Sequence, residues 1–285
     1  MLEQILTYAI LAIGIVYAIV ILIISYKKWN LVQASPGKLG ILAPVEVLIF
    51  ILAGIGFPDY VMHTILAKQL KLSSDRDLPG TLVGCGIVPG AILSTMLLKK
   101  GADSDIKTLI FCGIAIVIGS ILGSLIIGKL DGEKIKRVMQ IALVLSFVFL
   151  IVKIIVSSGA VGTEVALRGT RLYIVTALCF VTGLLNMIGV PMKPTRTAIF
   201  LIAGMSPMAT VTAVVVLGSL APISGGVAVL KQEIYQRKMV FAATIFGSIG
   251  AIIGALLVIS IPALILNALL IGMMLIAIIL MFKKN

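Results

Sequence analysis

The chain has 285 residues, of which 60% are hydrophobic and only 12% are charged, and its mean hydropathy is +1.23. Soluble domains are about 25% charged, so this composition excludes a soluble globular protein and makes the lipid bilayer the solvent for most of the chain. The net charge of +12 does not indicate a nucleic-acid partner, because Lys and Arg occur in short connections between apolar stretches, as the positive-inside effect predicts.

The first apolar stretch runs from Ile5 to Tyr26 and is followed by Lys27, Lys28 and Lys38. It exceeds about 20 residues, the length that spans a bilayer, and no basic segment precedes it, which distinguishes it from a signal peptide. We therefore expect residues 1–39 to form an extra N-terminal transmembrane helix with its N-terminus outside, followed by an inner connection.

Two series of apolar segments follow, and both begin with a pair interrupted by Gly-x-Pro. Gly56-Phe57-Pro58 recurs as Gly189-Val190-Pro191, at an offset of 133 in the numbering. Each half also holds a Gly-xxx-Gly element, Gly119/Gly123 and Gly250/Gly254, at an offset of 131. Small residues one turn apart let helices pack closely, and their equivalent positions predict contact near a two-fold axis.

The similarity predicts an all-α polytopic membrane protein with two repeats, repeat A over 40–157 and repeat B over 158–285. Each repeat has five segments, an odd number, so the second enters the membrane from the opposite side. The expected segments are 40–57, 59–70, 78–98, 106–128 and 136–156 in the first repeat, and 171–190, 194–204, 208–230, 236–258 and 262–282 in the second.

The distribution of basic residues supports this topology. With the N-terminus outside, the inner connections and the C-terminal tail carry 15 Lys and Arg, and the outer connections carry 6. Basic residues favour the cytoplasmic side, so we expect the C-terminus inside. The alternative, in which each interrupted pair crosses the membrane once, would weaken this bias.

The break motifs resemble those of the sulfite exporter (TauE/SafE) permeases, a family grouped with the toluene-sulfonate uptake permeases. The resemblance rests on Ala53 to Pro58, on Gly183 to Pro191, on the turn Gly204-Met205-Ser206-Pro207 and on the span 111–154. It implies a transporter of sulfite, sulfonates or other small organic anions. The chain departs from that family in lacking a run of three glycines at the breaks and in carrying polar residues there.

The second break carries the candidate anion site. Lys193 and Arg196 lie three residues apart just after Pro191, and charges inside a membrane are costly unless they face water or a ligand. A helix that begins there also directs free N–H groups at an anion. The candidate substrate-binding residues of this half are Lys193, Arg196, Thr195, Thr197, Asn186 and Gly189. The alternative is that both cations are anchors at the lipid interface.

The first break offers the matching positions, in which His63 aligns with Arg196 and Thr64 with Thr197. Gly56, Tyr60 and Thr64 complete the expected substrate-binding set. Asp59, His63 and Glu46 are the candidates for proton coupling, since a histidine titrates near neutral pH; each has the alternative of a structural role in hydrogen bonds or ion pairs.

The sequence lacks the motifs of other functional classes. Cys85, Cys112 and Cys179 form no CxxC pair, so we interpret them as packing residues and expect no metal site and no cofactor. No HExxH, Gly-x-Ser-x-Gly or P-loop occurs, which argues against an enzyme or an ATP-driven pump. We expect a secondary transporter of small anions in the cytoplasmic membrane, with proton coupling and homo-oligomer formation left open; the alternative is a channel through the two breaks.

Overall fold

The computed structural model describes residues 2–54, 57–99, 105–127, 129, 131–157, 162–257, 271–272, 275–276, 278–279 and 282. Regular structure in this part of the chain is helical, apart from one isolated bridge between Glu164 and Met205. Six of the described helices are long and apolar enough to cross a membrane. The chain is therefore an all-α, multi-pass membrane protein.

The helices follow the expected order. In chain order they are α1 (Leu2–Lys27), α2 (Trp29–Ala34), α3 (Leu39–Gly54), α4 (Asp59–Gln69), α5 (Leu78–Lys99), α6 (Ile106–Ile127), α7 (Gly132–Ser157), α8 (Gly169–Met187), α9 (Met192–Ile202), α10 (Pro207–Gln232), α11 (Arg237–Ala242), a π-helical turn (Ala243–Gly247) and α12 (Ser248–Leu256). The expected last span, 262–282, lies mostly outside the described residues.

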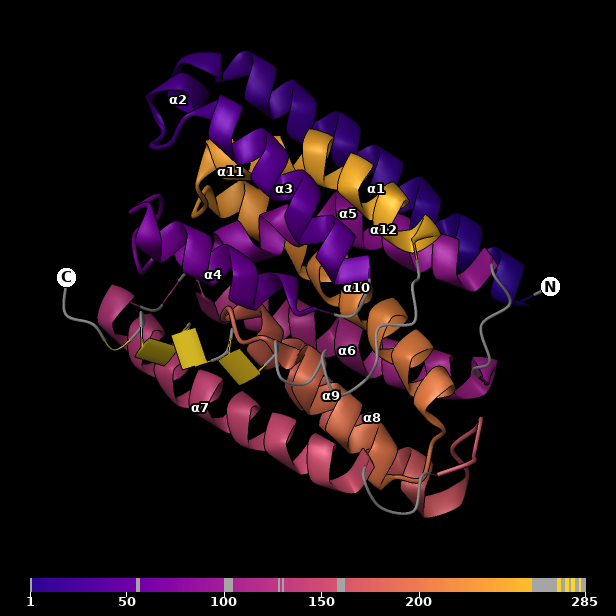
Figure 1. Ribbon diagram of the computed structural model, residues 1–285. Helices are drawn as coiled ribbons and strands as arrows, with labels where there is room; N and C mark the ends of the chain where they lie inside the picture. Colours follow the sequence, from indigo (N-terminus) through magenta and orange to yellow (C-terminus); the bar gives the residue numbers. More distant parts are fainter. Residues whose placement is uncertain are drawn as a thin grey trace.

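One group of connections meets at the end of the bundle that carries α2 (Figure 1). Lys238 Nζ donates to the carbonyl oxygens of Ser35 and Gly37, at 2.5 and 2.8 Å. Lys136 Nζ lies 3.8 Å from Asp75 Oδ2, and Lys28 forms an ion pair with Glu233. The connections after α1, α4, α6 and α10 therefore share one face, which we call the basic face.

A second group meets at the opposite face. Arg168 Nη1 lies 2.8 Å from Asp105 Oδ2, and the Glu164 amide donates to the Gly204 carbonyl oxygen at 3.2 Å. At this end the Lys99 ammonium lies 5.7 Å from the ring centroid of Tyr8, close to the N-terminus. The connections after α5, α7 and α9 thus lie together at this end of the bundle.

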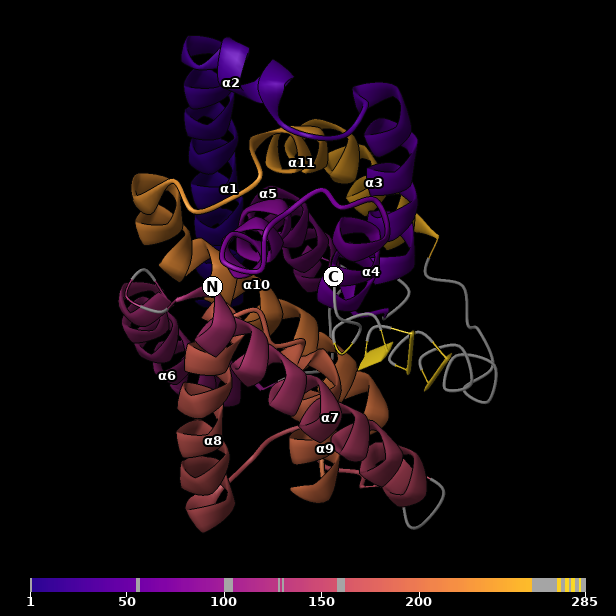
Figure 2. The ribbon, with the colours of Figure 1, turned by 90° about the vertical axis from the view of Figure 1, so that its left-hand side faces the viewer.

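The interrupted pairs form helical hairpins that open at opposite faces. In the first, α3 begins and α4 ends at the basic face, where Gly37 lies against Leu72. In the second, α8 begins and α9 ends at the other face, where Arg171 lies against Gly204. Each pair thus turns back within the molecule. Figure 2 shows the α8–α9 hairpin on the far side of α5 and α10 from α3.

The Gly-xxx-Gly elements pack each half of the chain onto the other. A Cβ at Gly119 in α6 would lie 2.1 Å from the Phe180 carbonyl oxygen in α8. A Cβ at Gly250 in α12 would lie 2.2 Å from the Val47 carbonyl oxygen in α3. Phe180 and Val47 are themselves related by the offset that relates the two Gly-x-Pro breaks. Close packing is confirmed, but the nearest neighbours of each element lie in a hairpin of the other half, not in the other Gly-xxx-Gly element.

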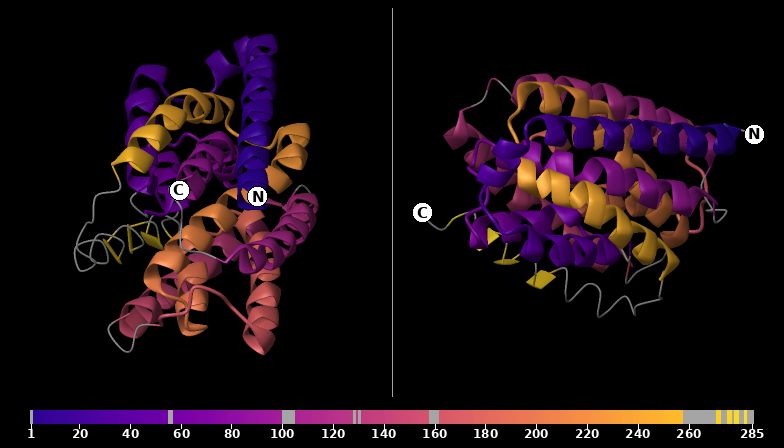
Figure 3. Two further views of the ribbon diagram at one scale, coloured as in Figure 1. Left: turned by 90° about the vertical axis from the view of Figure 1, so that its right-hand side faces the viewer. Right: turned by 90° about the horizontal axis from the view of Figure 1, so that it is seen from above.

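Helices α5 and α10 cross at the centre of the bundle, between the two hairpins (Figures 2 and 3). The Ser94 hydroxyl donates to Ser219 Oγ at 2.7 Å. Each helix contains an internal proline, Pro89 and Pro222, again related by the offset of the breaks. A proline inside a helix frees the carbonyl four residues before it. These helices therefore bring polar groups to the centre of the molecule, and α1 packs outside them against α5.

Candidate functional site

The tips of the two hairpins meet beside the α5–α10 crossing. Helix α4 begins at Asp59 after Pro58, and α9 begins at Met192 after Pro191, so the N-terminal end of each helix lies at a hairpin tip. The Asp59 carboxylate and the Lys193 ammonium form an ion pair across the tips, with Nζ 2.6 Å from Oδ1. Their side chains are 11% and 21% exposed.

A small cavity lies between the tips, and we call it the central cavity. Its volume is about 30 Å³, room for roughly two water molecules. Both hairpins and both crossing helices contribute to its wall. The lining residues are Phe50, Pro58, Asp59, Tyr60, Gly86, Gly90, Leu93, Asn186, Pro191, Met192, Lys193, Arg196, Val215, Gly218, Ser219 and Pro222.

Arg196 is a buried cation on this wall, and only 1% of its surface is exposed. Its Nε donates to Thr182 Oγ1 at 3.1 Å, and its Nη2 to the Thr182 carbonyl oxygen at 3.3 Å. Among the residues that the structure describes, Arg196 forms no ion pair, and Nη1, beside Gly218, has no hydrogen-bond acceptor. A buried guanidinium without a counter-ion is unfavourable, so an anion in the central cavity would be a favourable partner for this side chain.

Two further side chains of the predicted set also reach the central cavity. The Tyr60 hydroxyl is buried and has no hydrogen-bond partner among the described residues. Asn186 lines the wall and donates from Nδ2 to the Val190 carbonyl oxygen at 3.2 Å, which holds the turn between α8 and α9. The structure therefore gathers Asp59, Tyr60, Asn186, Lys193 and Arg196 around one space.

The remaining predicted binding residues do not line the central cavity. Thr64 and Thr197 each donate to a carbonyl oxygen of their own helix, four residues earlier. Gly189 has a φ of +89° and forms the turn before Pro191, a conformation that favours glycine. Thr195 faces a separate, mostly apolar cavity of about 460 Å³ between α7, α8 and α9. Gly56 lies outside the described residues.

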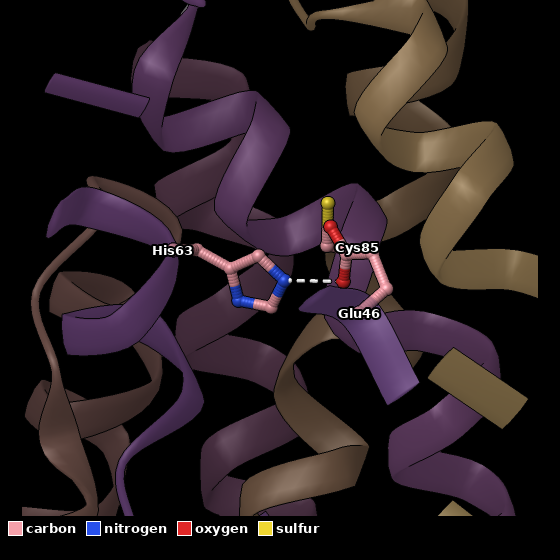
Figure 4. A group of neighbouring side chains, drawn as sticks. All are labelled: Glu46, His63 and Cys85. Carbon is pink, nitrogen blue, oxygen red and sulfur yellow. Dashed lines mark hydrogen bonds and ion pairs between the residues drawn. The ribbon is translucent and has the colours of Figure 1, made fainter. Parts of the chain in front are cut away.

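Glu46, His63 and Cys85 form a second polar cluster, and Figure 4 shows their side chains close to one another. All three are buried, and His63 lies beside Phe50 of the cavity wall. His63 Nε2 is 2.9 Å from Glu46 Oε2, and both side chains are 0% exposed. The ligand atoms of all three lie within 4.8 Å of one another. The sequence predicts a packing role for Cys85 because no CxxC pair contains it. The cluster has no sequence signature, since α3, α4 and α5 each contribute one member and no short motif joins them.

The cluster has the atom types of a metal site, but its hydrogen bonds are those of an acid–base pair. Glu46 Oε2 already contacts the histidine nitrogen that would bind a metal, while Glu46 Oε1 has no partner among the described residues. His63 Nδ1 contacts the Asp59 carbonyl oxygen at 2.9 Å. The cluster therefore links directly to the residue that holds Lys193.

Comparison of the chain with protein-family models, with curated protein sequences and with solved structures finds no match.

Proposed function

We propose that the chain is a secondary transporter of small anions, built from two inverted-topology repeats preceded by one extra transmembrane helix. Repeat A covers residues 40–157 and repeat B covers 158–285. The substrate site is the central cavity between the hairpin tips. The resemblance of the break motifs to sulfite exporter permeases leads us to include sulfite, sulfonates and small carboxylates as substrates.

Three features of the fold support the inverted repeats. The two hairpins open at opposite faces, as a repeat that enters the membrane from the other side requires. Helix α6 packs on the hairpin of the second half, and α12 packs on the hairpin of the first. The contacts Gly119 to Phe180 and Gly250 to Val47 are the same contact with the two halves exchanged.

The observation that carries the proposal is the environment of Arg196. It is a buried cation on the wall of the cavity and forms no ion pair with a described residue. A permanent positive charge in such a place binds an anion strongly, because water does not screen it. The N-terminus of α9 adds a positive dipole end that favours the same charge.

The small volume of the cavity implies that the site must open before an anion can enter. A sulfonate or a carboxylate is larger than two water molecules, so the hairpin tips must separate to admit it. Separation breaks the Asp59–Lys193 ion pair and frees the Lys193 ammonium, which then joins Arg196 and the Tyr60 hydroxyl as a ligand of the anion. Closing the site from one side and opening it from the other is alternating access.

A channel through the two breaks is the alternative. The ion pair across the tips and the volume of about 30 Å³ favour a carrier that encloses its substrate over a continuous pore. We also propose that the basic face lies on the cytoplasmic side, in keeping with the positive-inside effect, with the N-terminus outside, the C-terminus inside and the protein in the cytoplasmic membrane.

Thermal stabilisation by a panel of anions tests the proposal. A ligand that binds only the folded protein at 100 times its Kd raises the free energy of unfolding by about 2.7 kcal/mol. We expect sulfite, a sulfonate or a carboxylate to raise the melting temperature of the wild type and of Arg137→Met, which removes a surface arginine, but not of Arg196→Met. An equal response of Arg196→Met, or no response of the wild type to any anion, would contradict the anion site.

A further inference from the structure

The buried pair Glu46 and His63 lies next to the central cavity but does not line it. Phe50 stands between them, because it lines the cavity and its ring centroid is 5.6 Å from that of His63. Both members of the pair are 0% exposed. A carboxyl group and an imidazole completely shielded from solvent require an explanation beyond packing, and the inference drawn from them rests on the proposed function.

The two hydrogen bonds of the His63 ring fix the number of protons that the pair holds. The Asp59 carbonyl oxygen, 2.9 Å from Nδ1, can only accept, so Nδ1 carries a hydrogen. Nε2 lies 2.9 Å from Glu46 Oε2, and this contact is a hydrogen bond only if one further proton lies on the carboxyl group or on the ring. Without that proton, two lone pairs would face each other. The geometry is that of a pair that has bound one proton.

The charges around the pair indicate how this proton changes the balance of charge for a bound anion. The charged or titratable groups near the pair come from three helices. Cys85 of α5 and Asp59 of α4 lie next to it, and Tyr60 of α4 with Lys193 and Arg196 of α9 line the adjoining cavity. The protonated pair is neutral overall, and Asp59 balances Lys193. Arg196 then leaves one positive charge, which one monovalent anion neutralises. Once the proton leaves, the negative pair balances Arg196 itself, and an added anion would be an unpaired buried charge.

We propose that Glu46 and His63 form the proton site of the transporter, and that one proton binds together with each monovalent anion. Transport is then electroneutral proton–anion symport. The proton is taken up from water at the open side onto Glu46 or His63 and is released to water at the other side, so no charge is left behind in the membrane.

The contacts also connect the proton to the hairpin tip. The shared proton joins Glu46 on α3 to His63 on α4, the two arms of one hairpin. His63 in turn holds the carbonyl of Asp59, whose carboxylate holds Lys193 of the other hairpin. Loss of the proton breaks the contact between the arms and loosens the tip that closes the cavity. Deprotonation and anion release therefore favour the same conformational change.

The test measures the Kd of methanesulfonate, whose charge stays constant, as the pH is raised. Affinity falls in proportion to the fraction of protein in the binding-competent state, so the wild type should weaken about tenfold per pH unit once the pair is mostly deprotonated. In Glu46→Gln the amide donates to Nε2 and keeps the pair neutral without a titrating proton. That variant should bind at every pH with the low-pH affinity of the wild type. Glu133→Gln, which removes a surface carboxylate, should keep the wild-type slope.

The outcomes separate this inference from the proposed function. A wild-type Kd that does not depend on pH, or a Glu46→Gln variant that keeps the wild-type slope, overturns the proton site and leaves the anion site standing. If methanesulfonate binds to no form, the melting temperature without anion still tests the pair: it should fall with rising pH in the wild type and stay level in Glu46→Gln. Equal profiles of melting temperature against pH in the two proteins would overturn the proposal. A transition metal that the wild type binds and Glu46→Gln does not would also overturn it.

Discussion

The α3–α4 and α8–α9 hairpins occupy equivalent places in the fold but carry different chemistry. At the offset that relates the two breaks, Glu46 corresponds to Cys179, His63 to Arg196 and Cys85 to Gly218. In the first hairpin the basic side chain has a carboxylate at 2.9 Å. In the second, Arg196 has the neutral Thr182, and Gly218 lies beside Nη1. The basic side chain of the first hairpin therefore has a carboxylate partner, and that of the second has none among the described residues.

On the proposed function, this difference means that the two hairpins divide two tasks. The same two positions on α3 and α4, or on α8 and α9, hold either a titratable pair or a permanent cation. The titratable pair changes its charge with pH, while the guanidinium stays protonated at every physiological pH. We propose that the first hairpin binds the proton and the second binds the anion. Substitutions that make one hairpin chemically similar to the other, or that disturb the packing and the ion pair common to both, test this division.

The largest effect is expected when the second hairpin receives a carboxylate at the position equivalent to Glu46 of the first. In Cys179→Glu, a carboxylate at the position equivalent to Glu46 would pair with Arg196 and compete with the anion. Disturbing a buried, hydrogen-bonded charge pair costs about 2–5 kcal/mol, so anion affinity should fall at least about 30-fold. The isosteric neutral variant Cys179→Gln should bind nearly as the wild type does. Equal Kd values for Cys179→Glu and Cys179→Gln in titration calorimetry would contradict the role of the unpaired cation.

The packing that the hairpins share is the next test. Gly119→Ala and Gly250→Ala each place a Cβ about 2 Å from a carbonyl oxygen of the opposite half. Overpacking costs about 1–3 kcal/mol, so both variants should lose this much stability in equilibrium unfolding, and by similar amounts. Gly40→Ala, whose Cβ would meet nothing within 4 Å, should be neutral or slightly stabilising. A loss in only one of the two variants would break the equivalence of the two contacts.

A smaller effect is expected at the ion pair between the tips. Lys193→Met removes one positive charge from the site and should weaken anion binding about tenfold, because this partly exposed charge is worth about 1–2 kcal/mol. Asp59→Asn in the same chain removes the opposing charge but does not replace the lost contact, so the double variant should bind nearly as weakly as Lys193→Met. A double variant that regains the wild-type affinity would show that Lys193 acts through the balance of charge and does not contact the anion.

The smallest effect concerns the face opposite the basic face. Hydrogen bonds from the Arg168 guanidinium lower the pKa of Asp105 to about 2. Because the pKa is below the ordinary value of 3.8, the contribution to stability is present above about pH 4 and is lost as the pH falls through about 2. Asp105→Ser, which keeps a cap for α6, should cost about 0.5–1 kcal/mol at neutral pH, and only a small part of this cost should remain at pH 2, where about half of the Asp105 carboxyl is protonated. A deficit at pH 2 as large as that at neutral pH would contradict the ion-pair origin.

The fold was largely predictable from the sequence, and the site only in part. Apolar length and Gly-x-Pro breaks locate the spans and the hairpins, because a bilayer allows few other solutions. The charges beside the second break pointed to Lys193 and Arg196, since an intramembrane cation is rare. The sequence does not predict which hydroxyl groups face the cavity, because those of Thr64 and Thr197 can donate their hydrogen bonds within their own helix. The contact of Cys85 with His63 depends on packing between helices, which one sequence does not specify.

Flux through proteoliposomes tests the central claim most directly. A labelled sulfonate should accumulate when the outside is acidified, and the uptake should saturate, should not respond to an imposed membrane potential and should be accelerated by unlabelled anion on the other side. Glu46→Gln should keep the exchange of anion for anion but lose accumulation driven by the pH gradient, and Arg196→Met should lose both. Flux that does not saturate, or that is unchanged in Arg196→Met, would contradict a carrier whose anion site lies between the two hairpins.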